Sequence, residues 1–284
     1  MKRGQTALWI VLVLAGAVSF FSSQKVYTSR SHKLTESIYA LSLVPPAGAA
    51  VSSMEFKGIA SDFFFLRVMT FLGLKFGEPA QVSPREWDSI YTILDIATTL
   101  DPLFWDPYLL AGTMIMEGGP LEHADRLLLK AARELPDNYR PYFFLWFNSF
   151  YIQDNPAKAG FYLKEALKRP GAPYYFAGLA ARMDLYAHRT KDAIVFLKAQ
   201  ILDSQDSYVS EYLKKRLISL QIIDYLEEKL KDYEQQHGSK AKDLGQLVQA
   251  GLIKRIPTDP YGGKFLLLPD GRVYTSSKLV DTKK

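Results

Sequence analysis

Apolar residues recur at helical spacing over most of the chain, and prolines close three of these runs at a fixed interval. Pro102, Pro136 and Pro170 lie 34 residues apart. The helical runs that they close are Ile93–Leu100, Leu127–Leu135 and Phe161–Arg169. Proline lacks the backbone N–H and its ring clashes with the preceding turn, so it ends a helix. The constant period predicts an array of helix-turn-helix units, each of which buries its apolar face against its neighbours.

Further side chains of matching size obey the same offset. Large aromatic residues stand at Tyr108, Tyr142 and Phe176, and large apolar ones at Leu94, Leu128, Tyr162 and Phe196. With this pattern, residues 86–203 resemble the tetratricopeptide-repeat family, which implies a mainly α fold of stacked helix pairs. The departures from the family pattern are Trp146 at a small-residue position, Lys158 and Asp192 at alanine positions, and Ser204 at the fourth proline.

The resemblance implies a protein-binding surface, because such arrays bind other proteins on the concave face lined by the first helix of each pair. The partner-binding positions of the third repeat are then Arg140, Phe143, Phe147, Phe150 and Tyr151. Their counterparts in the second repeat are Leu109, Thr113, Met116 and Glu117. Four aromatic residues on one surface would be costly to leave exposed to water, so we expect them to be covered. A partner peptide, the N-terminal helix or the C-terminal domain are the alternatives.

The N-terminal segment carries no charge from residue 5 to residue 24, which is about the length needed to cross a hydrocarbon core of roughly 30 Å. We expect residues 1–24 to be a retained transmembrane anchor; a signal peptide cleaved after Ala15-Gly16-Ala17 is the alternative. Lys2 and Arg3 precede the span. This favours a single pass through the inner membrane with the bulk of the chain facing the periplasm. Residues 25–50, with Pro45-Pro46, are expected to form a partly extended connector.

The apolar segment Met54–Phe76 is interpreted as the first helix of repeat one, within a repeat region of residues 51–205. A second membrane span is the alternative, but Asp62 and Arg67 would lie near its middle at a cost of several kcal/mol. We expect these two charged residues to be solvated or to cap a helix.

The repeat signature fades after the fourth repeat. We expect residues 206–238 to form one long amphipathic helix, or two, that caps the array and ends at Gly238. Residues 239–284 are expected to form a small α+β domain with a helix at Lys242–Ala250 and a hairpin around Pro269-Asp270-Gly271. Residues 222–273 resemble the C-terminal half of type II secretion major pseudopilins. The residues that carry this resemblance are Pro257, Asp259, Pro260, Tyr261 and Gly262.

Composition and motifs narrow the function classes. The net charge of +5 is scattered along the chain, and no stripe of Lys and Arg indicates nucleic-acid binding. The chain has no cysteine, which excludes disulfides, thiolate metal sites and a lipoprotein anchor. We found no catalytic, phosphate-binding or dinucleotide-binding motif, so we expect neither an enzyme nor a cofactor. Asp259 and Asp270 offer too few carboxylates for calcium, so we expect no metal.

These features together favour a membrane-tethered protein–protein interaction scaffold of the bacterial cell envelope, serving pilus or secretion assembly. The alternative is a structural subunit of an envelope complex that assembles through its pseudopilin-like C-terminal domain. Both readings expect a protein partner from the envelope, a pilus or a secretion system.

Overall fold

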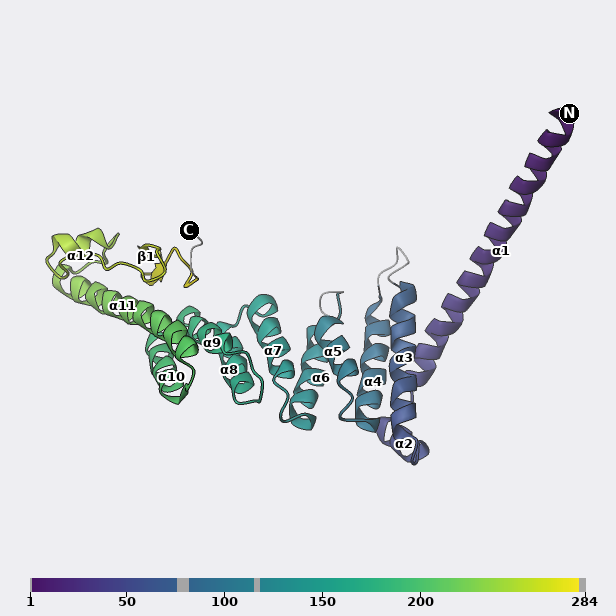
Figure 1. Cartoon of the computed structure of the whole chain (residues 1–284), viewed down its shortest axis with the longest axis horizontal. Coiled ribbons are helices and arrows are strands. Elements are labelled where there is room, and N and C mark those ends of the chain that lie inside the picture. Colours follow the sequence, from purple (N-terminus) through teal and green to yellow (C-terminus); the bar gives the residue numbers. More distant parts are fainter. Residues whose placement is uncertain (1, 76–81, 115–117, 281–284) are drawn as a thin grey trace. The chain divides into compact units, whose positions relative to one another are not determined.

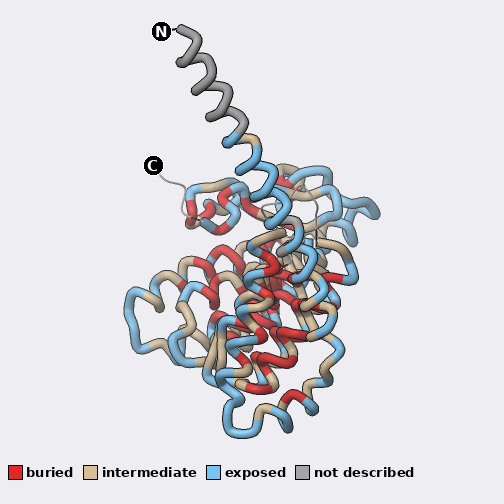
Figure 2. Tube along the Cα trace, turned by 90° about the vertical axis from the view of Figure 1, so that its right-hand side faces the viewer, coloured by how far each residue is buried: buried red, intermediate tan, exposed pale blue. Residues whose placement is uncertain are grey.

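The computed structural model describes the backbone of residues 2–75, 82–114 and 118–280 (Figure 1). The side chains of residues 2–14, 27, 28, 30 and 31 are outside the description. The described chain is mainly helical and divides into two compact units, Met1–Leu135 and Pro136–Lys284. Each unit is built from helices packed in pairs, with buried positions along the sides that face one another (Figure 2).

The first unit contains six helices within its described residues. They are α1 (Lys2–Ser42), α2 (Pro46–Ser52), α3 (Lys57–Lys75), α4 (Pro84–Leu100), α5 (Trp105–Met114) and α6 (Leu121–Glu134). The pairs α3–α4 and α5–α6 pack against each other around one hydrophobic core. A capping box starts α4: the Ser83 side chain accepts from the Glu86 N–H, and the Glu86 carboxylate accepts from the Ser83 N–H.

The expected extended connector is largely helical, because α1 continues through Ser42 before a short turn leads into α2. Leu34 and Ile38 are buried in the core of the first unit, where α1 packs against α3 and α4. The Ser42 hydroxyl also donates to Ser89 on α4 at 3.2 Å. The apolar positions Leu34, Ile38 and Leu41 have helical spacing, and their burial stabilises the helix where small residues and Pro45-Pro46 suggested extended chain.

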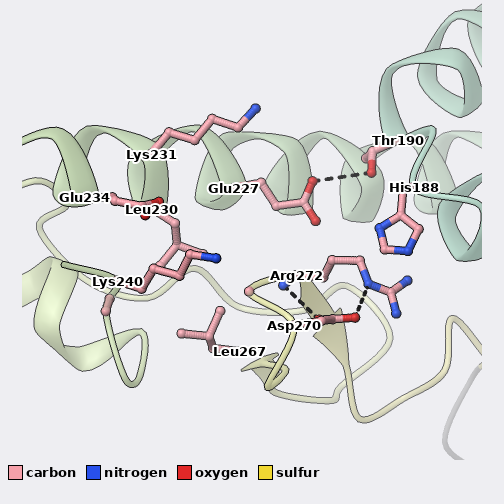
Figure 3. Close-up of a pocket in the computed structure, with 12 residues that line it drawn as sticks. His188, Thr190, Glu227, Leu230, Lys231, Glu234, Lys240, Leu267, Asp270 and Arg272 are labelled. Carbon is pink, nitrogen blue, oxygen red and sulfur yellow. Dashed lines mark hydrogen bonds and ion pairs between the residues drawn. The ribbon is translucent and has the colours of Figure 1, made fainter. Parts of the chain in front are cut away.

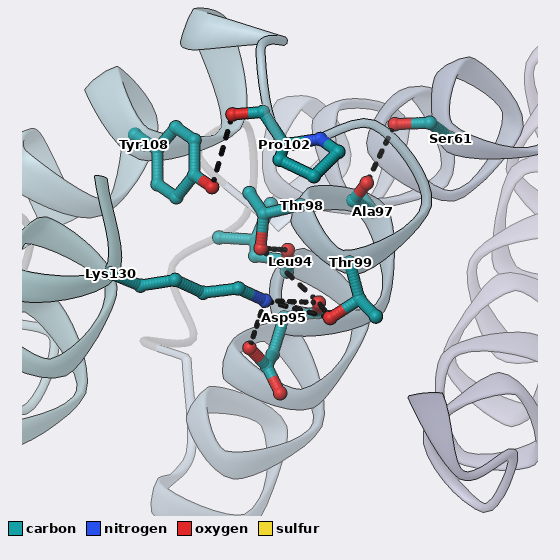
Figure 4. Close-up of polar contacts among 9 residues, drawn as sticks. All are labelled: Ser61, Leu94, Asp95, Ala97, Thr98, Thr99, Pro102, Tyr108 and Lys130. Carbon is teal, nitrogen blue, oxygen red and sulfur yellow. Dashed lines mark hydrogen bonds and ion pairs between the residues drawn. The ribbon is translucent and has the colours of Figure 1, made fainter. Parts of the chain in front are cut away.

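Polar contacts fix the helix pairs of this unit to one another (Figure 4). Lys130 on α6 reaches α4, where its Nζ lies 2.6 Å from Asp95 Oδ1 and 2.7 Å from Thr99 Oγ1. Ser61 on α3 donates to the carbonyl of Ala97 on α4 at 2.9 Å. These contacts satisfy polar groups that the packed helices remove from water.

The second unit continues the helical pairs. Its helices are α7 (Arg140–Phe147), the π-helix η2 (Asn148–Ile152), α8 (Pro156–Leu167), α9 (Tyr175–Tyr186), α10 (Thr190–Asp203), α11 (Ser207–His237) and α12 (Gly245–Gln249). The α8 and α9 helices are joined by an ion pair between a half-buried lysine and a buried aspartate, with Lys164 Nζ 2.5 Å from Asp184 Oδ2. Of the two alternatives, the structure has a single long helix in α11, and Gly238 ends it in the left-handed conformation.

The predicted period is visible in the helix boundaries. Within the second unit, α8 and α10 begin at Pro156 and Thr190, which are 34 residues apart. The residues two positions earlier, Asp154 and His188, both have positive φ, so the turns before these helices share one conformation. Pro102, Pro136 and Pro170 follow the ends of α4, α6 and α8, as predicted.

The C-terminal segment packs against α11 within the second unit. Strands β1 (Phe265–Leu267) and β2 (Val273–Thr275) form an antiparallel hairpin with Leu266 opposite Tyr274, which confirms the predicted hairpin. The buried Asp259 accepts from the Ser219 hydroxyl of α11 at 3.3 Å, from the Tyr261 N–H at 3.0 Å and from the Thr275 hydroxyl. The loop of residues 259–262 is therefore held against α11 and β2 by the hydrogen bonds of Asp259.

In the part of the chain that the structure describes, no helix is long and apolar enough to cross a membrane. Much of the expected anchor, up to residue 14, lies outside the residues whose side chains are described. Its described part is exposed, including Val18, Phe20 and Phe21.

Candidate partner-binding surface

The expected binding residues lie on α7 and the π-helix that continues it. In η2 the Gln153 N–H donates to the Asn148 carbonyl at 3.0 Å, a five-residue step that widens the helix by one residue. A π-helical turn is rare in proteins, and here it forms the C-terminal end of the helix that α7 begins. The widening changes the direction of the side chains that follow it. The prediction from the 34-residue offset assumed a regular α-helix and therefore did not include this change.

The structure brings the four expected aromatic residues into one cluster. The Tyr151 ring lies 4.8 Å from both the Phe147 and the Phe150 ring centroids. Phe143 joins them through Trp146, whose ring is 5.3 Å from Phe143 and 6.1 Å from Tyr151. Arg140 is exposed at the start of α7. Tyr151 is the most exposed of the four aromatic residues, at 57%.

Side chains of the same unit cover part of this cluster. Phe143 stacks on Phe176 of α9 at 5.7 Å, with the two ring planes 10° apart. Phe150 stacks on Tyr186, also of α9, at 5.8 Å and 10°. The hydroxyls of Tyr186 and Tyr274 of β2 share a hydrogen bond of 2.7 Å. Burial, together with this hydrogen bond, raises the pKa of Tyr274 above its usual range. The C-terminal segment thus contacts Tyr186, the residue that stacks on Phe150.

The covering residues were missed in part by sequence reasoning. Phe176 obeys the 34-residue offset as a large aromatic residue, but it was not included among the residues of the binding surface. Trp146 was read as a departure from a small-residue position, and here its ring connects Phe143 to Tyr151. No period in the sequence links Tyr186 to Tyr274, because that contact depends on how the hairpin folds back onto α9.

Two buried polar atoms next to the cluster lack a hydrogen-bond partner among the described residues. They are Trp146 Nε1 and Ser149 Oγ, at the junction of α7 and η2. Buried polar atoms without partners are rare in folded proteins and cost free energy. Their presence beside an exposed tyrosine marks the junction as a place where the chain departs from optimal packing.

Two of the four counterparts in the second repeat are described, and they belong to the first unit. Leu109 is exposed and Thr113 is half-buried. Met116 and Glu117 lie outside the described residues.

A cavity of about 300 Å³ lies elsewhere in the second unit, between α11, the turn before α10 and the hairpin (Figure 3). The acidic residues that line it are equal in number to the lysine and arginine residues, and two of these charged residues form an ion pair with each other. Arg272 Nε donates to Asp270 Oδ2 at 2.7 Å, and Glu227 accepts from the Val273 N–H at 3.2 Å. Burial raises the pKa of the Glu227 carboxyl. These contacts hold the hairpin against α11 and leave no unbalanced charge to select a ligand.

The described residues contain no group of acidic or histidine side chains arranged to hold a metal ion. Asp259 and Asp270 belong to different hydrogen-bond networks. Asp259 is buried, whereas Asp270 lies at the surface and pairs with Arg272. Comparison with protein-family models and with curated proteins finds no match for this chain.

Proposed function

We propose that this chain is a membrane-tethered scaffold that holds a protein partner of the bacterial cell envelope. The observation that carries the proposal is the aromatic surface on α7 and η2, which remains partly exposed at Tyr151 and Ile152 although the chain's own aromatic residues flank it. Tyrosine at the centre of such a surface contributes strongly to binding between proteins. The resemblance to tetratricopeptide repeats supports the same use of the first helices.

The proposed tether is the N-terminal part of α1. The helix is continuous from Lys2 to Ser42, and its far end is buried in the first unit at Leu34 and Ile38. Between these ends the described residues Val18, Phe20 and Phe21 are exposed to solvent. These apolar residues lie within the uncharged run from residue 5 to 24, where contact with lipid would stabilise them. We propose a single pass through the inner membrane with the two units in the periplasm.

The resemblance of the C-terminal segment to major pseudopilins supports a partner from a pilus or secretion assembly. Within this chain the segment is engaged in packing, because Phe265, Val273 and Leu279 belong to the core formed with α11. A segment used in this way favours the scaffold over a subunit that assembles through its own C-terminal domain.

Site-specific photo-crosslinking in intact membranes tests the proposal. A photoreactive amino acid replaces Tyr151 in one variant and Tyr208, an exposed tyrosine on α11, in the matched control. We expect one discrete adduct with an envelope protein at position 151, absent at position 208. The adduct is then expected to disappear when Ile152→Ser is added. Equal labelling at both positions, or none at position 151, contradicts the assigned surface.

A further inference from the structure

The outer face of α3 carries a stripe of exposed apolar side chains. Phe56, just before the helix, is 59% exposed, and Ile59, Phe63 and Leu66 are 69%, 45% and 60% exposed. The opposite face, with Phe64, Val68 and Phe71, is buried. The described residues of this unit therefore use one side of α3 for the core and leave a second apolar side without a cover.

The spacing of this stripe is that of a coiled-coil seam. Phe56, Ile59, Phe63, Leu66 and Thr70 follow one another at intervals of 3, 4, 3 and 4 residues. This alternation is the a and d pattern of a heptad, in which one helix packs along a second helix. The seam is short, but α3 is already held in place by α1 and α4, so docking does not have to order it.

Two charged residues flank the seam at the positions that select a partner. Asp62 precedes Phe63 and occupies a g position, while Arg67 follows Leu66 and occupies an e position. In parallel pairs of helices, a g residue faces the e residue of the partner helix five positions further on. Asp62 and Arg67 are five residues apart. The same face on a second copy is therefore complementary in charge.

Neither charge is neutralised within the described structure. The ion pairs found among the described residues include neither Asp62 nor Arg67, and the Arg67 guanidinium lies over the Phe63 ring at 5.1 Å. In an antiparallel pair, g faces g and e faces e. Asp62 would then face Asp62 of the other copy, which is destabilising. The arrangement of charge thus selects the parallel orientation.

We propose that two copies of this chain associate through α3, with the helices parallel and a twofold axis running along the seam. The interface consists of Phe56, Ile59, Phe63 and Leu66 from each copy, flanked by two Asp62–Arg67 ion pairs. Equivalent residues meet across the axis, as in other twofold dimers.

Membrane attachment gives a separate argument for this orientation, and this argument alone rests on the proposed anchor. The α1 helix runs from its N-terminal end toward α2, and α3 returns beside its base (Figure 1). A twofold axis along α3 sends both copies of α1 in the same sense, so both anchors reach one bilayer. An antiparallel pair would send them in opposite senses. Confinement to one membrane also raises the effective concentration of the copies.

Cysteine crosslinking of the full-length protein in detergent tests the proposal, because the natural chain has no cysteine. We expect Leu66→Cys alone to form a disulfide-linked dimer under mild oxidation. Val195→Cys, an exposed position of the second unit, is the control and is expected to stay monomeric. An antiparallel pair in which Asp62 faces Asp62 places Ile59 opposite Phe63, so it gives a dimer only when Ile59→Cys and Phe63→Cys chains are mixed, and that result overturns the proposal. A yield of disulfide-linked dimer from Leu66→Cys that is no higher than that from Val195→Cys also overturns the proposal.

Charge reversal supplies the second arm, with the dimer dissociation constant as its readout. Asp62→Arg and Arg67→Asp are each expected to weaken the dimer, and the double variant is expected to restore it. Leu66→Asp places two carboxylates against each other and is expected to weaken the dimer by at least about 100-fold. Because Leu66 is exposed, its thermal unfolding should match that of the natural chain. A double variant weaker than both singles, or protection of Leu66 by a different protein or by lipid without the dimer, overturns the proposal.

These measurements are independent of the proposed function. Crosslinking in detergent requires neither insertion of α1 nor a partner on the aromatic surface, and the photo-crosslink at Tyr151 does not require the dimer. A failure of one is therefore distinguishable from a failure of the other.

Discussion

The guanidinium of Arg216 donates a 2.6 Å hydrogen bond from Nη2 to the backbone carbonyl of Leu279, 63 residues further along the chain. Its Nη1 donates to the carbonyl of Gly178 on α9 at 2.9 Å. Arg216 is only 4% exposed. One side chain of α11 therefore connects the last helical pair to the end of the C-terminal segment, and it does so through charged hydrogen bonds inside the core.

We predict that Arg216→Met destabilises the second unit by about 3 kcal/mol, because two buried carbonyls lose charged donors. The measurement is thermal unfolding, followed by limited proteolysis of the C-terminal segment. Lys214→Met, an exposed cation of the same helix, is the matched control and should change stability by less than about 0.5 kcal/mol. Equal unfolding temperatures for both variants would contradict the assigned role.

The stability of the C-terminal segment should depend on pH through Asp259. Burial acts to raise the pKa of this carboxyl, but hydrogen bonds from Ser277, Thr275 and the backbone outweigh it and hold the pKa below the ordinary value of 3.8. The stabilisation is therefore complete at neutral pH and is lost as the pH falls below about 4, through the lowered pKa.

We predict that Asp259→Asn costs about 2 kcal/mol at pH 7, since the amide cannot accept all of these hydrogen bonds. The difference from the natural chain should shrink below about pH 4, where the natural carboxyl takes up its proton. Denaturant unfolding at a series of pH values measures both effects. Asp203→Asn, at the exposed end of α10, should leave the curve unchanged. A difference independent of pH would show that the charge of Asp259 does not stabilise the fold.

Buried and exposed residues of the segment formed by α7 and η2 should respond differently to truncation. Leu145 is fully buried, so Leu145→Ala is expected to cost about 2–5 kcal/mol. Tyr151→Ser removes a larger but exposed side chain and is expected to change stability by less than about 1 kcal/mol while weakening partner capture. Thermal unfolding and the crosslinking yield separate the two effects. If Tyr151→Ser unfolds the unit as Leu145→Ala does, the aromatic cluster serves packing alone.

Membrane attachment predicts that the protein fractionates with membranes and resists extraction by carbonate or high salt. The hydrocarbon interior would hold the uncharged run from residue 5 to 24. N-terminal sequencing of the purified protein is the check on retention. A mature N-terminus near Val18 would instead show cleavage as a signal peptide.

Sidedness follows from Lys2 and Arg3 ahead of the proposed span. A reporter active only outside the cytoplasm should work when it is fused after Lys284. A reporter that is active only in the cytoplasm, fused at the same point, provides the reciprocal measurement. Activity of the cytoplasmic reporter alone would reverse the orientation and move the search for a partner to the other side.

Helix pairs were predictable from the sequence because their determinants are local. The prolines end helices wherever the tertiary structure places them, and Asn155 caps α8 through its side chain, which accepts from the Lys158 N–H at 2.9 Å. The helical continuation of α1 was missed, because Leu34 and Ile38 gain their stabilisation from α3 and α4, which lie elsewhere in the sequence. Because Pro45-Pro46 favours a turn, the sequence predicted partly extended chain from residue 25, whereas α1 continues to Ser42.

The composition of the aromatic surface was predictable only in part. The 34-residue offset selects the four aromatic residues Phe143, Phe147, Phe150 and Tyr151, since it carries the geometry of a regular helix from one repeat to the next. It carries no information about the π-helix, which depends on the packing of Asn148 and Ser149 in the interior. The contact between Tyr186 and Tyr274 joins residues 88 positions apart, and no local pattern encodes it.

The continuity of α1 has a mechanical consequence. Its 41 residues at 1.5 Å each make a rod about 60 Å long, with no proline between Lys2 and Ser42 to act as a hinge. One end of the rod is clamped in the first unit by Leu34 and Ile38. If the other end is held in lipid, a tilt of about 10° there moves the clamped end by about 10 Å, a displacement that follows from the helical rise alone. A change in the tilt of the proposed anchor within the bilayer would therefore displace the whole first unit.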